Sequence, residues 1–155
     1  MRKNDPITKL MSKNIESVQQ GQALSDIYKL ICNTGIHHVP VLDGKKLVGL
    51  VSFTDIMKLS MAIDTTNSHT IDALIDQHSS IVDIMTTALT TIGDGQTVRD
   101  AAEILSGGDF HSLPVVDNNG NIVGMLTSTD LIRYLNAQYW LDNSGVIMEK
   151  QKIEK

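Results

Sequence analysis

The sequence contains a single cysteine, Cys32, among its 155 residues. One cysteine excludes an internal disulfide and any zinc site built on several cysteines. Cys32 stands at the end of an apolar helical pattern, and unpaired cysteines are among the most buried residue types. We therefore expect a small buried side chain here rather than a nucleophile.

Long apolar runs and basic clusters are also missing. No run approaches the roughly 20 residues that cross a bilayer, and the N-terminal MRKNDPITKL lacks the apolar core of a secretory signal. The net charge is −5, and the 13 Lys and Arg residues are scattered apart from a Lys-rich stretch at 150–155. Surfaces that bind nucleic acid normally carry a basic patch. These absences predict a soluble, cytoplasmic protein with no membrane partner and no direct nucleic-acid partner.

What the sequence does contain is an internal repeat. Apolar and polar residues of the first half recur 74 positions later, as in the pairs Ile7 and Ile81, Asp26 and Asp100, His37 and His111, and Pro40 and Pro114. From Gly49 and Gly124 onward the spacing is 75, because the second copy has one extra residue in a turn. Such a change is well tolerated in a hairpin loop.

Each copy predicts the order strand, helix, strand, strand, helix. In the first copy we expect an extended piece at 15–18, a helix from Leu24 closed by Gly35, strands at 39–42 and 47–51, and a helix from Thr54 or Asp55 to about 63. In the second copy we expect a helix capped by Thr97 and Asp100, strands at 115–116 and 122–126, and a last helix carrying Leu131, Ile132, Leu135 and Trp140. Between the copies, Ile71, Leu74 and Ile75 predict one or two helical turns.

The fold class is therefore α+β, with two β-α-β-β-α units. We place the first domain at 1–63, a polar linker at 64–79, the second domain at 80–140 and a polar C-terminal tail at 141–155. Neither unit has enough apolar surface to stand alone comfortably. The two should pack together about a pseudo-twofold axis.

The most informative stretch is GLVSFTD at 49–55, with its second copy GMLTSTD at 124–130. In each, a glycine and apolar residues precede hydroxyls and one carboxylate, and an apolar helical run follows. The first backbone N–H groups of a helix have no partner within the helix, so side chains at this junction can cap them or can meet a ligand. Asp55 and Asp130 are either acids that complement the helix dipole, with Thr54 and Thr129 as caps, or ligand-binding residues.

The segments IHHVPVLDGKKLVGLVSFTDIM and FHSLPVVDNNGNIVGMLTSTDLI resemble the cystathionine β-synthase (CBS) domain pair, also called a Bateman module. The resemblance covers about 6–62 and 80–137, and both copies are in register. It implies two tandem CBS domains that bind an adenosine-containing ligand in clefts between them. In such pairs the Asp of one repeat holds the ribose, and an apolar segment of the other repeat holds the adenine.

Carried over to this sequence, the resemblance implies two clefts. One would use Ser52, Thr54 and Asp55 with Leu89, Phe110 and His111. The other would use Thr127, Thr129 and Asp130 with Ile15, Ile36 and His37. The residue types suit the chemistry, because a carboxylate accepts hydrogen bonds from ribose hydroxyls, and hydroxyls and free N–H groups at a helix start suit a phosphate.

The ligand is expected to be AMP first, with ADP, ATP or S-adenosylmethionine as alternatives. His38 and Ser112 stand where related adenylate sites often have Arg or Lys, and the lack of cations disfavours a triphosphate. Mg²⁺ would enter only with a polyphosphate. No metal site of the protein's own and no covalent cofactor is expected.

We therefore predict a non-enzymatic regulatory sensor, with energy sensing as its role, that is a homodimer and acts through an unidentified protein target. The dimer is inferred from the apolar content of the terminal helices, at Met57, Met61, Leu131, Leu135 and Trp140. One alternative is a structural interaction module with empty clefts. The other is a metal-dependent or nucleotide-processing enzyme that uses two His and two Asp across the interface, although no HExxH or nucleophile-elbow motif supports it.

Overall fold

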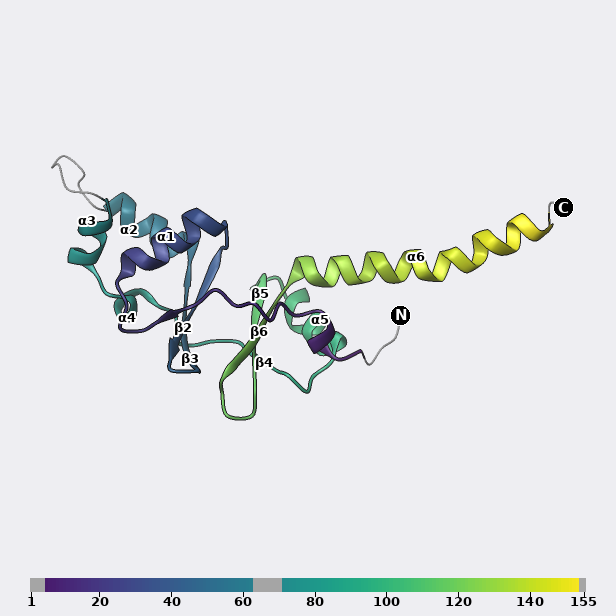
Figure 1. Cartoon of the computed structure of the whole chain (residues 1–155), viewed down its shortest axis with the longest axis horizontal. Coiled ribbons are helices and arrows are strands. Elements are labelled where there is room, and N and C mark those ends of the chain that lie inside the picture. Colours follow the sequence, from purple (N-terminus) through teal and green to yellow (C-terminus); the bar gives the residue numbers. More distant parts are fainter. Residues whose placement is uncertain (1–4, 63–70, 154–155) are drawn as a thin grey trace.

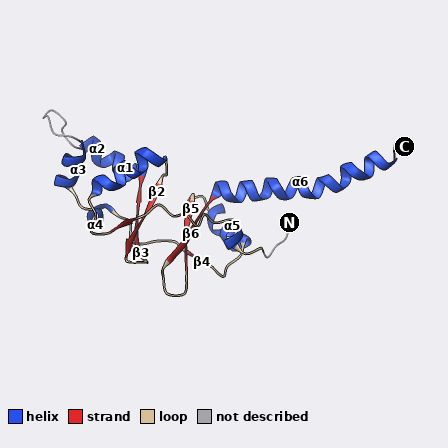
Figure 2. Ribbon diagram, in the orientation of Figure 1, coloured by secondary structure: helices blue, strands red, loops and turns tan. Residues whose placement is uncertain are grey.

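A computed structural model describes residues 5–62 and 71–153, and it contains two similar units side by side (Figures 1 and 2). Each unit has one three-stranded sheet, in which the first strand is parallel to the second and the second is antiparallel to the third. The first unit comprises β1 (Val18–Gln19), α1 (Leu24–Thr34), β2 (His38–Asp43), β3 (Lys46–Ser52) and α2 (Phe53–Ala62). The second comprises β4 (Ile92–Gly93), α5 (Val98–Ser106), β5 (Ser112–Val116), β6 (Ile122–Thr127) and α6 (Ser128–Ile153). The predicted α+β class and the β-α-β-β-α order are confirmed.

The helix signals in the sequence correspond to real helix ends. In α1 the apolar positions Leu24, Ile27 and Ile31 are buried, and Gly35 adopts a left-handed φ of 71° at the C-terminus, as predicted. In α5 the Thr97 side chain accepts from the Asp100 N–H, while the Asp100 carboxylate accepts from the Thr97 N–H. This reciprocal pair, a capping box, starts α5 where the sequence predicts.

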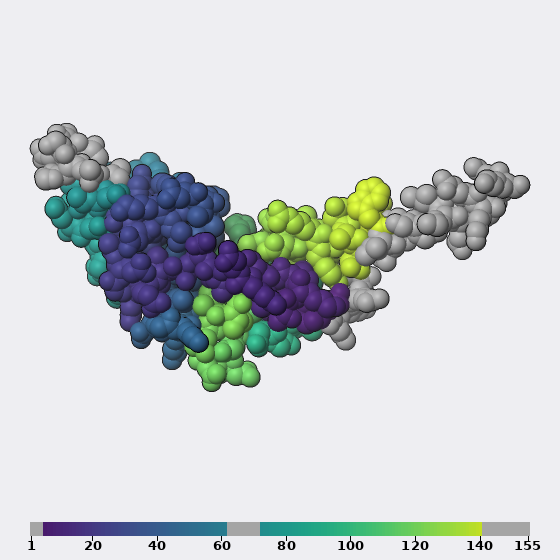
Figure 3. All heavy atoms as spheres, in the orientation of Figure 1, coloured from purple at the N-terminus to yellow at the C-terminus, as the bar shows by residue number. Residues whose placement is uncertain are grey.

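The two units exchange their leading segments. Three short helices precede or link the units: η1 (Ile7–Lys9), α3 (Ile71–His78) and α4 (Ile81–Ile84). Ile7 is fully buried in the core of the second unit, whereas Ile81, at the matching position of the second repeat, is fully buried in the core of the first. Figure 3 shows the N-terminal segment, in dark purple, running across the front of both units. The exchange ties the units together.

Backbone hydrogen bonds repeat across a pseudo-twofold axis. The Leu47 N–H donates to Gly120 O, and the Ile122 N–H donates to Lys45 O, both at 3.1 Å. Residues 12 and 125 form a two-way bridge, and so do their repeat equivalents, residues 86 and 50. Because the partners match through the repeat spacing, the predicted pseudo-twofold packing is confirmed.

The region between the repeats is more than a linker. Leu74 and Ile75 of α3 lie in the first core, so the expected helical turns there are confirmed. The first part of the expected linker, to residue 70, lies outside the described residues, as do residues 1–4 and 154–155. At the other end of the chain α6 passes through the expected boundary at 140 and extends to Ile153, well beyond the rest of the molecule (Figure 1).

Two expectations about burial are wrong. Cys32 is exposed, because it follows the buried Ile31 by one residue and therefore points away from the apolar face of α1. Leu131, expected on the dimer surface, is only 8% exposed and packs in the second core. Among the described residues, no helix is long and apolar enough to span a membrane.

Candidate functional site

The carboxylates of the two motifs start helices α2 and α6 through capping boxes. The Ser52 N–H and hydroxyl both donate to Oδ2 of Asp55, at 2.9 and 2.6 Å. The Thr127 N–H and hydroxyl donate to Oδ2 of Asp130 in the same way, at 2.8 and 2.6 Å. The capping hydroxyls thus belong to Ser52 and Thr127. The sequence had indicated Thr54 and Thr129 as the caps in the case where the motif binds no ligand. Each box uses one carboxylate oxygen and leaves the other for a different contact.

Capping boxes occur at two further helices of this chain. Oδ2 of Asp83 accepts from the N–H and hydroxyl of Ser80, and Oδ2 of Asp100 accepts from the N–H and hydroxyl of Thr97. In both boxes these bonds lower the pKa of the carboxyl, because they favour the charged form. A capping box therefore does not by itself mark a ligand site. A ligand site also needs a cavity beside the carboxylate.

Asp55 lies in a cavity between the two units, which we call the cleft cavity. Its volume is about 290 Å³. The first unit contributes Ser52 and Asp55, and the second contributes Leu89, Phe110 and His111. These are the residues predicted for the first cleft, with the exception of Thr54. A carboxylate thus faces an aromatic and an aliphatic side chain across the interface, which is the arrangement that a ribose and a flat base require.

A second cavity, of about 590 Å³, lies on the pseudo-twofold axis, and we call it the axial cavity. Its walls contain four pairs of residues related by the repeat. The pairs are His37 and His111, His38 and Ser112, Ser52 and Thr127, and Thr54 and Thr129. Phe53 lies beside His37, with ring centroids 5.9 Å apart and edge-to-face. The cavity is therefore shared between the repeats rather than owned by one.

Four residues of the second predicted cleft line the axial cavity. Thr127, Thr129, Ile36 and His37 line the axial cavity, together with Thr54 of the first prediction. Asp130 and Ile15 line neither of these two cavities. Oδ1 of Asp130 lies 3.7 Å from Nη1 of the largely exposed Arg133, while Oδ2 accepts from Thr127 at the end of β6.

Among the described residues that line the two cavities, only histidines can carry a positive charge. Burial lowers the pKa of His38, and the nearby charges of His37 and His111 lower it further, while Asp55 opposes them. The free protein therefore keeps His38 neutral at pH 7. An anion bound here would meet hydroxyls, the neutral imidazole of His38, and the side chains of His37 and His111.

Several wall residues were not predicted. His38 lines both cavities, Ser112 does so as well, and Asp109, Thr86 and Thr90 line the cleft cavity. Ser112 is the repeat equivalent of His38, so the repeat spacing could have indicated it. The wall at 86–90 lies just after α4, and its place at the cleft follows from the exchange of segments.

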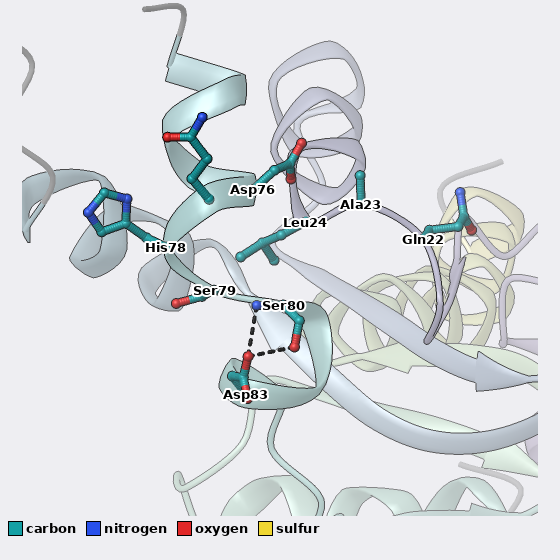
Figure 4. A pocket seen from close by; sticks show the side chains of 9 residues that line it. Gln22, Ala23, Leu24, Asp76, His78, Ser79, Ser80 and Asp83 are labelled. Carbon is teal, nitrogen blue, oxygen red and sulfur yellow. Dashed lines mark hydrogen bonds between the residues drawn. The ribbon is translucent and has the colours of Figure 1, made fainter. Parts of the chain in front are cut away.

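A third cavity, of about 430 Å³, lies on the first unit between the start of α1, the end of α3 and α4 (Figure 4). Its carboxylates already have structural partners. Asp76 accepts from the N–H and the hydroxyl of Ser25, each at 2.8 Å, and Asp83 accepts from Ser80. Within the described residues, no group of three or more His, Cys, Asp or Glu side chains is placed to hold a metal ion.

Comparison with known proteins identifies the family. Residues 7–62 and 81–137 match the CBS domain. The chain belongs to the CBS domain family. Both repeats are CBS domains, and the resemblance seen in the motifs is confirmed.

Three relatives illustrate what this CBS pair is similar to. The uncharacterized protein MJ1225 of Methanocaldococcus jannaschii is 27% identical, over 84% of this chain and 47% of its own length. The structure of CBSX2, a protein of Arabidopsis thaliana, in complex with AMP has a TM-score of 0.72 and 25% identity, and covers 87% of this chain and 98% of that one. The CBS domain pair of MJ0100, in complex with 5′-methylthioadenosine and S-adenosylmethionine, has a TM-score of 0.68 and 25% identity, with the same coverage.

Other relatives include multidomain enzymes. The homoserine O-acetyltransferase of Methanohalobium evestigatum is 28% identical, but the chain spans only 24% of its length. The chain likewise spans less than half of MJ1225. The chain therefore matches only part of each of these longer proteins.

Proposed function

We propose that this CBS pair is a non-enzymatic regulatory module that binds an adenosine-containing ligand in the cleft cavity, with AMP as the first candidate. One observation supports this most directly: Asp55 of one repeat faces Leu89 and Phe110 of the other across the cleft cavity. Similar CBS pairs hold AMP in CBSX2 and 5′-methylthioadenosine and S-adenosylmethionine in MJ0100. ADP and ATP remain alternative ligands, in keeping with the original expectation.

In the proposed complex Oδ1 of Asp55 accepts from the ribose hydroxyls, while Oδ2 keeps its bonds to Ser52. The adenine lies between Leu89 and Phe110, the latter 40% exposed in the free protein and so available to cover a base. The phosphate points toward Thr54, His37 and His111 at the axis. Since no Lys or Arg of the described part of the chain lines either cavity, a triphosphate would need Mg²⁺ to balance its charge.

The test compares two aspartates with the same capping role. Asp55→Ala and Asp100→Ala each remove a capping box, at a cost of about 1 kcal/mol of stability. Only Asp55→Ala should lose affinity for AMP and adenosine in titration calorimetry, by on the order of 10-fold to 100-fold, because it also removes a charged acceptor. Equal affinities in the two variants would refute the ribose role of Asp55. No heat with AMP, ATP or S-adenosylmethionine would favour a structural interaction module instead.

We also propose that the module is a homodimer that passes its signal to a protein target. Met61, Ile132 and Leu135, on α2 and α6, are 81%, 65% and 49% exposed, although they are large and apolar. Trp140, which the sequence placed on the dimer surface, is also exposed. A second copy could cover this surface, and ligand binding could then favour one arrangement of the repeats.

Sedimentation tests the dimer. Leu135→Lys places a charge in the exposed apolar stripe and should shift the protein toward monomer. Ala137→Lys, at an exposed position on a different face of α6, is the matched control and should leave the sedimentation coefficient unchanged. A wild-type monomer at micromolar concentration would refute the dimer.

A further inference from the structure

The cleft cavity and the axial cavity are joined through a common wall. His38, Ser52, His111 and Ser112 line both of them. A ligand whose ribose lies at Asp55 and whose 5′ end points away from Leu89 and Phe110 would extend along this wall. The axial cavity is the space into which a phosphate on that ribose would extend.

The axial cavity is open to the second repeat in the same way. Thr127, Thr129, Ile36 and His37, which the sequence assigns to the second cleft, line it. A phosphate on a ligand in that cleft would thus arrive in the same space. The residues that would receive it are the repeat equivalents of those that receive the first phosphate, such as Thr129 for Thr54 and His37 for His111.

Hydroxyl donors in the axial cavity are available for such a group. The side chains of Thr54 and Thr129 make no hydrogen bond within the described part of the chain, while Ser52 and Thr127 are held by their capping boxes. Helices α2 and α6 both begin at this cavity, so their positive dipole ends add to the attraction for an anion.

Resting on the proposed function, we propose that the axial cavity is a single proton-linked anion site shared by the two clefts, for which the phosphates of two ligands compete. One phosphate is accommodated by hydroxyls and by imidazoles that take up a proton. A second phosphate in the same space meets the charge of the first without any Lys or Arg to offset it.

The charges around the cavity explain the proton uptake. His37 and His38 stand at the start of β2, His111 stands before β5, and the carboxylates nearby are Asp55 on α2 and Asp109 at the cleft wall. Asp130 on α6 is turned to Arg133. In the free protein, burial lowers the pKa of His38, and the nearby charges of His37 and His111 lower it further. A bound phosphate reverses the balance, so binding draws a proton and becomes tighter as the pH falls from 8 to 6.

Calorimetry with AMP and with adenosine, which lacks the phosphate, tests the inference on the full chain. Adenosine should bind two sites per chain, and its affinity for each site should be the same at pH 8 as at pH 6. AMP should fill one site at pH 8, with the second weaker by on the order of 10-fold or more, and the difference should shrink at pH 6. Titration in buffers of different ionisation enthalpy should show proton uptake with AMP and none with adenosine.

Variants and a competitor locate the effect. His38→Gln and the more exposed His111→Gln should each reduce the proton uptake with AMP. His78→Gln, whose ring Nδ1 contacts Leu74 O in the third cavity, is the matched control and should keep it. Inorganic phosphate should weaken AMP binding and leave adenosine binding unchanged.

The outcomes separate the inference from the proposed function. If neither adenosine nor AMP binds, both the adenosine-binding function and the shared anion site are refuted. If adenosine binds but AMP fills two equal sites without proton uptake, or if adenosine fills a single site only, the shared anion site is refuted while the adenosine-binding function stands.

Discussion

At the scale of single residues, the glycines that open the two motifs are held by close contacts with the other repeat. A Cβ atom on Gly49 would lie 2.5 Å from Sδ of Met85, and a Cβ on Gly124 would lie 2.5 Å from Sδ of Met11. Both methionines come from the exchanged segments. The glycines therefore serve the packing between repeats rather than a special backbone angle, since neither has a positive φ.

We predict that Gly124→Ala destabilises the protein by about 1–3 kcal/mol, as overpacking does, and that Gly49→Ala costs less. The Cβ at position 124 would also lie 3.1 Å from the backbone oxygen of Ser12, whereas at position 49 the neighbours are side-chain atoms of Met85 alone. Denaturant unfolding measures both. Met85→Ala should relieve part of the Gly49→Ala cost in a double-mutant cycle, and a purely additive cycle would contradict the contact.

At the scale of elements, the exchange of leading segments has energetic consequences. Ile7 and Ile81 occupy equivalent places in the two repeats and both are fully buried, each in the core of the other unit. Replacing either by Ala should cost about 2–5 kcal/mol, as for other buried large-to-small substitutions. The two variants should nevertheless loosen different helices.

Hydrogen exchange distinguishes the two. Ile7→Ala should speed exchange in α5 of the second unit more than in α1, and Ile81→Ala should do the reverse, because local opening follows the core that loses its contact. If each substitution instead loosened the unit to which it belongs in sequence, the exchanged packing would be wrong.

The same exchange shows why the sequence predicted the elements better than their partners. Periodicity identifies which face of a helix is apolar, and the buried residues of α1, namely Leu24, Ile27 and Ile31, follow the helical spacing in the sequence. Periodicity does not say which core a short segment such as residues 7–11 joins, since that depends on the path of the chain in space. The apolar pattern also stretched to Cys32, which lies one residue past the buried stripe and is exposed.

Some residues of the candidate site could likewise be predicted from the sequence, and others could not. The residues of the first cleft, apart from Thr54, could be found from the motif and its resemblance to the CBS pair. His38 and Ser112, on the wall common to both cavities, were assigned to neither cleft; the repeat spacing pairs them, but it does not show that both line the cavities near the axis. The contact of Asp130 with Arg133 could not be predicted either, since it depends on the side-chain conformations of the two residues in α6.

At the scale of the whole molecule, the two CBS domains should fold as one cooperative unit. The first core includes Leu74, Ile75 and Ile81, which follow the first repeat in sequence, and the second core includes Ile7, from the start of the chain. Each half therefore depends on the other for part of its core. In addition, the hairpins are joined at the axis by the hydrogen bonds between Leu47 and Gly120 and between Lys45 and Ile122.

We predict that a chain divided between residues 66 and 67 gives two fragments that fold only together. Fragment 1–66 lacks the three isoleucine and leucine side chains from 74–81 that complete the first core, and fragment 67–155 lacks Ile7. Each alone buries too little apolar surface to offset the entropy of ordering its chain. Circular dichroism of the separate and mixed fragments measures this. Independent folding of either fragment, with an unfolding midpoint unchanged by the other, would show that the domain boundaries in the sequence are also boundaries of stability.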